Sequence, residues 1–196
     1  MAKACFLYFG KDKTNLPVRD AIEETVNYLK SKIAFEHTII EFSDDLPIYW
    51  FSNWYNYAYN CYFCDPKKSF NPFLNKIPEG YHIYVALFRM QGKKPCITSA
   101  CYRPESTIWN TPLVATPYDL DDCFNRVGNL WRYRLTQRIV HDIVNALYLL
   151  KLTTRLADNC PRYGYKRTDE GWKSCYDWIL SQVKAKLVIK ALKGAK

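Results

Sequence analysis

The stretch Lys3-Ala4-Cys5-Phe6-Leu7-Tyr8-Phe9, closed by Gly10, decides the fold class. A short apolar run that ends at a glycine predicts a buried β-strand. The segment after it carries apolar residues every three or four positions, which is the pattern of a helix with one buried face. These residues are Val18, Ile22, Val26, Leu29 and Ile33. Residues 38–42 predict a second strand, and a strand, a helix and a strand in this order predict an α/β fold.

Two more strands are predicted beyond this first unit. Residues 83–88, Ile-Tyr-Val-Ala-Leu-Phe, form the clearest buried strand of the chain. Residues 96–102 alternate polar and apolar side chains, which predicts an edge strand. Residues 104–121 contain three prolines, and we expect a loop there.

The C-terminal part predicts two helices. From 123 to 156 apolar residues surround the helix almost completely, which is typical of a central, buried helix. A last helix is expected over 169–193, with acidic residues at its start and lysines at its end. We therefore expect a single α+β domain over 1–196, in which a mixed, twisted sheet packs on a long central helix and a basic C-terminal helix lies outside. Residues 1–122 supply the strands, and residues 123–196 form the helical, basic region.

The composition limits the class of protein. A chain of 196 residues, 48% of them hydrophobic, can bury a full core and is too apolar for intrinsic disorder. No apolar run reaches the roughly 20 residues of a membrane span. The apolar N-terminal stretch is too short for a signal peptide. We expect an intracellular protein, cytoplasmic or mitochondrial, without a transmembrane segment.

The positive charge is concentrated in the C-terminal third. The net charge is +9, but residues 1–122 hold 13 basic and 14 acidic side chains, whereas residues 123–196 hold 15 and 5. This asymmetry indicates an acidic partner, which is nucleic acid, an anionic membrane face or an acidic protein. The alternative is a solvated basic surface. The candidate contacts are Lys184, Lys186, Lys190 and Lys193.

Eight cysteines allow two interpretations. Free thiols are favoured, because a chain of this length needs no disulfides and shows no signal peptide. The alternative is a zinc site in which two short-spaced pairs supply four thiolates. These pairs are Cys61 with Cys64, and Cys96 with Cys101.

Residues 47–64 are unusually aromatic. The candidate partner-binding residues are Trp50, Phe51, Trp54, Tyr55, Tyr57 and Tyr59. Tryptophan and tyrosine are enriched among the energetic anchors of protein interfaces, so the segment predicts a partner surface. The alternative is a small second core beneath a long loop. No lysine or arginine interrupts the segment, which weakens a nucleic-acid interpretation.

One segment of the predicted central helix carries a motif, Arg138-Ile-Val-His-Asp-Ile-Val-Asn-Ala-Leu147. It resembles the His-Glu-x-x-His helix of zincin peptidases, in which two histidines hold zinc and the glutamate activates a water. Within the zincins, the chain resembles the leishmanolysin-like metzincins. Residues 77–86 are similar to their strand before the active-site helix, and residues 98–101 are similar to their edge strand. The resemblance covers about residues 77–150 and implies a metzincin-like frame.

The motif departs from the zincin pattern at the positions that hold and use the metal. His141 stands at the first ligand, Asp142 replaces the glutamate, and Asn145 replaces the second histidine. No histidine follows His141, so the third ligand of the family has no counterpart. Tyr148 replaces the glycine at which the family's helix breaks, so we expect this helix to continue to Leu156. The alternative for His141 is a packing residue inside the core.

These observations predict a protein without a cofactor that is not an enzyme. We expect a pseudoprotease, a non-catalytic metalloprotease-like domain that serves as a structural or binding subunit of a larger assembly. One alternative is an RNA-contacting accessory subunit, such as one of an organellar ribosome, which the basic C-terminal third suits. Another is an active zinc metallopeptidase with atypical ligands. The chain has neither a glycine-rich phosphate loop nor a Gly-x-Ser-x-Gly elbow.

Overall fold

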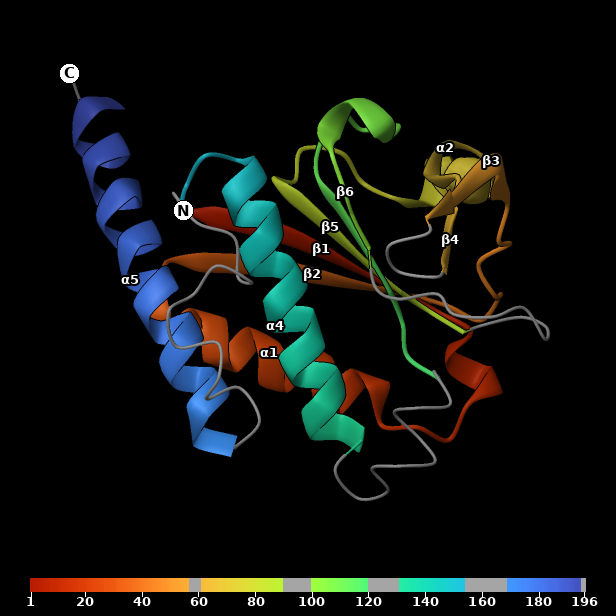
Figure 1. The fold of residues 1–196 in the computed structure, drawn as a ribbon, viewed down its shortest axis with the longest axis horizontal. Helices are drawn as coiled ribbons and strands as arrows, with labels where there is room; N and C mark the ends of the chain where they lie inside the picture. The colour runs from red at the N-terminus through yellow and green to blue at the C-terminus, as the bar shows by residue number, and fades with distance from the viewer. Residues whose placement is uncertain (57–60, 90–99, 120–130, 154–168, 195–196) are drawn as a thin grey trace.

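A mixed five-stranded sheet forms the centre of the computed structural model, which describes residues 1–56, 61–89, 100–119, 131–153 and 169–194 (Figure 1). The strand order is β2-β1-β5-β7-β6. Neighbouring strands are parallel except at the edge strand β6, which is antiparallel to β7. The strands are β1 (Ala2–Phe9), β2 (Phe35–Phe42), β5 (Ile83–Phe88), β6 (Ala100–Tyr102) and β7 (Leu113–Pro117). The predicted mixed sheet is confirmed.

The central strands are covered on both faces, which explains their continuous apolar sequence. Every residue of β5 is buried, and in β1 only Lys3 is half-exposed. Because side chains alternate along a strand, Ala4, Phe6 and Tyr8 of β1 face one core, and Cys5, Leu7 and Phe9 face the other. The register pairs Ala4 with Ile83 and Cys5 with Tyr84, so β1 and β5 line both cores together.

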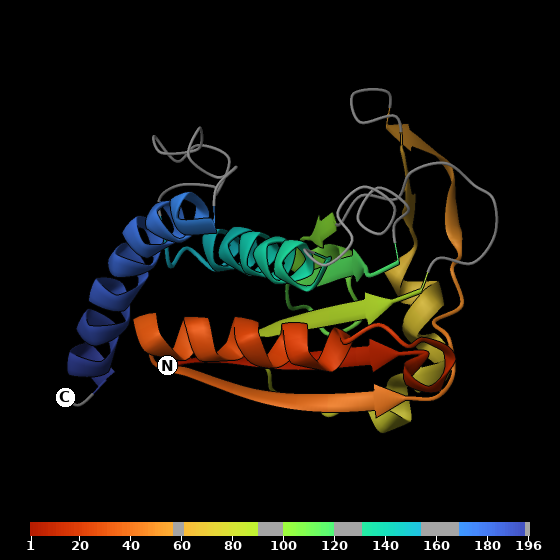
Figure 2. The same ribbon diagram turned by 90° about the horizontal axis from the view of Figure 1, so that it is seen from below.

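Three long helices cover one face of the sheet. They are α1 (Val18–Lys32), α4 (Trp131–Leu149) and α5 (Asp169–Gly194), and their apolar residues share one core with Ala4, Phe6 and Tyr8. Helix α4 packs against both α1 and α5 as well as against β7. Figures 1 and 2 place α5 at one end of the molecule and the small elements α2, β3 and β4 at the other.

Short elements and aromatic side chains cover the second face. The elements are α2 (Pro66–Phe70), η2 (Asn71–Lys76) and η3 (Pro104–Ser106), and α2 is capped by Asp65, whose carboxylate accepts hydrogen bonds from the amides of Lys67 and Lys68. The Phe9 ring stacks on Phe42 at 4.5 Å and meets Phe73 edge-on at 4.9 Å. A separate antiparallel pair is formed by β3 (Trp50–Asn56) and β4 (Cys61–Cys64).

Two predicted boundaries are wrong. Residues 104–121 are not simply a loop, because β7 lies within them and pairs with both β5 and β6. The central helix does not continue to Leu156, since it ends at Leu149 and Lys151 takes a left-handed conformation with φ 58°. The amide of Leu152 then donates to the carbonyl of Leu147, which closes the helix end without a glycine.

The cysteine prediction is wrong in part. Cys5 and Cys101 are free thiols, as expected, but Cys175 on α5 is disulfide-bonded. Which cysteines lie close enough to bond depends on tertiary contacts that spacing does not reveal. Within the described parts of the chain, no helix combines the length and the apolar character that a membrane crossing requires.

Candidate functional site

The motif helix α4 packs against the sheet, α1 and α5, so its faces meet different surroundings. On the sheet side, the Arg138 guanidinium donates to the carbonyl of Pro117 at 3.3 Å, next to the end of β7. On the α1 side, the Thr136 hydroxyl donates to Glu24 at 3.4 Å. These contacts hold α4 in a fixed rotation about its axis, and that rotation decides where each motif residue lies.

Asp142 faces the sheet. Its carboxylate is only 4% exposed and accepts a hydrogen bond from the hydroxyl of Thr116 on β7 at 3.2 Å. The Cys101 thiol of β6 lies in the same region. Burial raises the pKa of Cys101 to about 12, and the negative charge of Asp142 acts in the same direction. The thiol is therefore protonated at neutral pH. Asp142 is buried beneath α4 and is held there by its hydrogen bond to Thr116.

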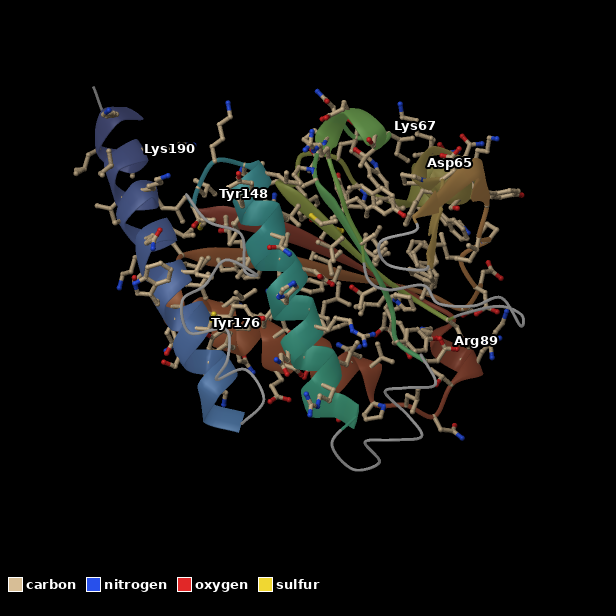
Figure 3. All side chains as sticks on the ribbon, in the orientation of Figure 1. Asp65, Lys67, Arg89, Tyr148, Tyr176 and Lys190 are labelled. Carbon is tan, nitrogen blue, oxygen red and sulfur yellow. The ribbon has the colours of Figure 1, made fainter. Side chains whose placement is uncertain are left out.

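His141 directly precedes Asp142 in the chain, and its side chain faces α5. Its Nδ1 lies 3.0 Å from the hydroxyl of Tyr176, and the two groups are hydrogen-bonded. The rings meet edge-on with centroids 6.2 Å apart. Tyr176 is 1% exposed and lies on α5 (Figure 3), so the second helix covers this side of the imidazole.

Helix α5 is held in place from α1 as well. The Tyr28 hydroxyl donates to the Asp177 carboxylate at 2.7 Å, and Lys32 forms an ion pair with the same carboxylate at 3.1 Å. Asp177 follows Tyr176 directly in the chain. The hydrogen bond between His141 and Tyr176 is thus part of a three-helix contact.

The motif does not assemble a metal site among the described residues. A catalytic zinc needs three protein ligands and one open position. Asn145 lies one helical turn after His141 and is half-buried, so the amide stands where a second imidazole would be needed. Throughout the described ranges, no group of three His, Cys, Asp or Glu side chains is placed to hold a metal ion.

The other predicted site residues lie on several different elements, and among them Cys101 is close enough to Asp142 to feel its charge. Lys184, Lys190 and Lys193 are exposed on α5, and Lys186 is half-buried and donates to the carbonyl of Lys151 at 3.4 Å. Trp50, Phe51, Trp54 and Tyr55 belong to β3, whereas Tyr57 and Tyr59 lie outside the described residues. Of the four cysteines considered for a zinc site, Cys61 and Cys64 are the first and last residues of β4 and Cys101 lies on β6. Cys96 lies outside the described residues.

A charged cluster at the carboxyl ends of β1, β2 and β5 was missed by the sequence analysis. Asp45 accepts hydrogen bonds from Arg89 at 3.0 Å and from Lys13 at 3.1 Å, both on Oδ2. Burial pushes the pKa of Asp45 up, but these two cations outweigh it and hold the pKa below its ordinary value. Gly10 has φ 69°, and a Cβ there would lie 2.5 Å from Asp45 Oδ1, so the backbone must approach the carboxylate closely.

The chain offers one faint signal for this cluster, the glycine directly after the first strand. Nothing in the spacing joins Asp45 to Arg89, because Asp45 follows β2 and Arg89 follows β5, and the two are brought together by the pairing of both strands with β1. The Tyr118 hydroxyl completes the cluster by donating to the carbonyl of Phe9 at 3.1 Å. These contacts fasten the segments that follow four strands, β1, β2, β5 and β7, to one another.

No protein-family model, curated protein or solved structure matches the chain.

Proposed function

We propose that this chain is a non-catalytic, metalloprotease-like domain that serves as a structural or binding subunit of a larger assembly. The frame supports the proposal, since a buried strand, an antiparallel edge strand and a long helix packed on the sheet follow one another as the resemblance implies. The strand β7, which enters between the edge strand and the helix, widens the sheet without changing that order.

The amide of Asn145, one helical turn after His141, carries the proposal. A zinc-binding histidine uses one ring nitrogen and commonly hydrogen-bonds through the other, so the contact of Nδ1 with the buried Tyr176 hydroxyl at 3.0 Å leaves Nε2 as the nitrogen that a metal could use. A catalytic zinc needs three protein ligands, and an amide at the position of the second imidazole is a poor one. The neighbouring Asp142 is buried and accepts a hydrogen bond from Thr116, which is the environment of a structural carboxylate. The residues of the motif therefore act as packing and hydrogen-bonding groups that join α4 to α5 and to the sheet.

Metal content and peptidase activity test the non-catalytic part. We expect the purified chain, dialysed against excess zinc and then against buffer, to retain no zinc that depends on His141. The variants are His141→Gln and, as a matched control at another half-buried histidine, His37→Gln on β2. One zinc per chain that disappears in His141→Gln and persists in His37→Gln, together with peptide hydrolysis, overturns the proposal.

The size of the native complex tests the subunit part. The chain has a mass of 23.1 kDa, so a structural or binding subunit should sediment from a gentle cell extract well above that mass. The purified chain added to the same extract provides the reference. Sedimentation of the native protein at the mass of the free chain contradicts a role in an assembly.

A further inference from the structure

Helix α5 has two apolar faces, and only one of them has a place in the core. The inner face consists of Tyr176, Ile179, Leu180 and Val183, all of which are buried against α1 and α4. The outer face begins further along the helix. Ala185, Val188, Ile189 and Leu192 are spaced by three, four and seven residues from the first, so they line one side of the helix. We call these four residues the outer stripe.

The outer stripe is unusually exposed. Val188 is 52% exposed, Ile189 51% and Leu192 68%. Seven large hydrophobic residues are exposed in the described parts of the chain, and three of them lie within residues 188–192. Single exposed apolar residues need no explanation, but a contiguous group on one helix face is typical of an interaction surface.

The end of α5 is also poorly supported by the body of the protein. Its last turns lie at the outer margin of the molecule in both views (Figures 1 and 2), and Lys190 marks this end in Figure 3. A cavity of about 340 Å³ separates it from the body, with Leu150, Leu152 and Leu187 in its walls. The outer stripe points away from the inner face that borders this cavity, so no described element covers it.

Lysines border the stripe on both sides. Lys184 lies one turn before Val188, and Lys193 lies one turn after Ile189, which places them on opposite flanks. Residues 181–194 contain four lysines and no acidic residue. Lysines in the last turn are expected from the helix dipole alone, but that effect fades within one turn and does not account for Lys184.

We propose that the outer stripe docks an acidic amphipathic helix of a partner protein. This rests on the proposed function, because it names the class of partner that the subunit binds. The apolar face of such a helix covers Val188, Ile189 and Leu192, and its carboxylates lie beside Lys184 and Lys193. A second copy of this chain is disfavoured as the occupant, because its stripe would bring lysines against lysines. Continuous apolar residues between the lysines likewise suit a helix better than a phosphate backbone.

A designed peptide tests the stripe directly. The probe is a fluorescein-labelled peptide of three Leu-Glu-Glu-Leu-Leu-Glu-Ala repeats, and its control replaces each glutamate with lysine. We expect saturable binding of the acidic peptide to the full chain by fluorescence anisotropy, and none of the basic peptide. Binding should weaken as salt rises from 50 to 500 mM, roughly as expected for exposed charges.

Variants locate the binding. Ile189→Gln with Leu192→Gln should weaken affinity by about tenfold or more, which corresponds to about 1.4 kcal/mol. Lys184→Glu with Lys193→Glu should do the same. Leu74→Gln, an exposed apolar position on η2, and Lys30→Glu, an exposed lysine on α1, are the matched controls and should leave binding unchanged. Circular dichroism checks that each variant stays folded.

Several results overturn this inference. The peptide assay overturns it if neither peptide binds saturably, if both bind equally, or if the control variants lose binding. Sedimentation equilibrium overturns it if the free chain self-associates and Leu192→Gln abolishes that association. Binding to phosphatidylglycerol vesicles that depends on the outer stripe, without binding of the acidic peptide, also overturns it. The proposed function is tested separately, by zinc binding at His141, by peptidase activity and by the size of the native complex. The docking inference can therefore fail while the proposed function stands.

Discussion

Removing the Tyr176 hydroxyl should destabilise the protein without affecting any metal chemistry. Tyr176 is 1% exposed, and its hydroxyl lies 3.0 Å from His141 Nδ1. A buried hydrogen bond contributes about 0.5–1.5 kcal/mol, and His141 is half-buried, so water compensates in part. We expect Tyr176→Phe to lower the free energy of unfolding by about 1 kcal/mol. For a chain of this length, that corresponds to a fall in Tm of about 2–4 °C.

A double-mutant cycle isolates the contact. Tyr176→Phe and His141→Leu are measured singly and together by urea unfolding, and we expect a coupling of about 0.5–1.5 kcal/mol. Tyr81→Phe is the control, because its hydroxyl donates to Thr38 at 2.7 Å on another part of the sheet, so it should show no coupling to His141→Leu.

Zinc provides the result that refutes this reasoning. A ligand at 100 times its Kd stabilises the folded state by about 2.7 kcal/mol, which would raise Tm by about 5–10 °C. If zinc produces such a rise in the unmodified chain and His141→Leu abolishes it, the imidazole binds metal. If the two substitutions are simply additive, the hydrogen bond does not join the helices in solution.

Three further predictions concern Gly10, Asp45 and the free cysteines. Gly10→Ala should lower the free energy of unfolding, measured by urea unfolding, by at least about 1–2 kcal/mol because the φ of Gly10 is 69°. The added Cβ also clashes with Asp45 Oδ1, so Gly10→Ala should cost less stability in an Asp45→Ala background. Because Asp45 has a lowered pKa, its stabilising contribution is present above about pH 4 and is lost as the pH falls through that lowered pKa, so Asp45→Asn should reduce the acid dependence of Tm. Burial raises the pKa of Cys5 and Cys101 to about 12, so iodoacetamide at pH 8 should modify them only after unfolding, as seen by mass spectrometry. Rapid alkylation in the folded state contradicts the latter.

The elements with long, regular patterns could be predicted from the sequence. The strand β1, the strand β5 and the helices α1 and α5 were predicted within a few residues. Strand β7 could not, because Pro112 precedes it, Pro117 ends it, and prolines usually mark loops. The structure resolves this conflict by placing Pro117 at the last position of the strand, where the next amide, of Tyr118, supplies the hydrogen bond to Phe88.

The candidate site was predictable in its residues and not in its contacts. The sequence identifies His141, Asp142 and Asn145 as the motif positions, but the partner of His141 is 35 residues away on another helix. The rotation of α4 is set by packing on β7 and α5, and a helix that is apolar almost all round gives no indication of which side meets which neighbour. The end of α4 was missed for a similar reason, since Lys151 supplies a left-handed residue where glycine is the usual signal.

The central place of β1 has a consequence for how the chain folds during synthesis. Its first partner, β2, follows within 42 residues, but its second partner, β5, begins only at Ile83. At about 5–20 residues per second, the ribosome needs roughly 2–8 s to add the intervening residues. During this interval one edge of β1 has no strand beside it, and Leu7 and Phe9 have yet to meet Ala86 and Phe88. The nascent N-terminal unit therefore combines an unpaired strand edge with exposed apolar side chains, which are the features that make a folding intermediate prone to aggregation.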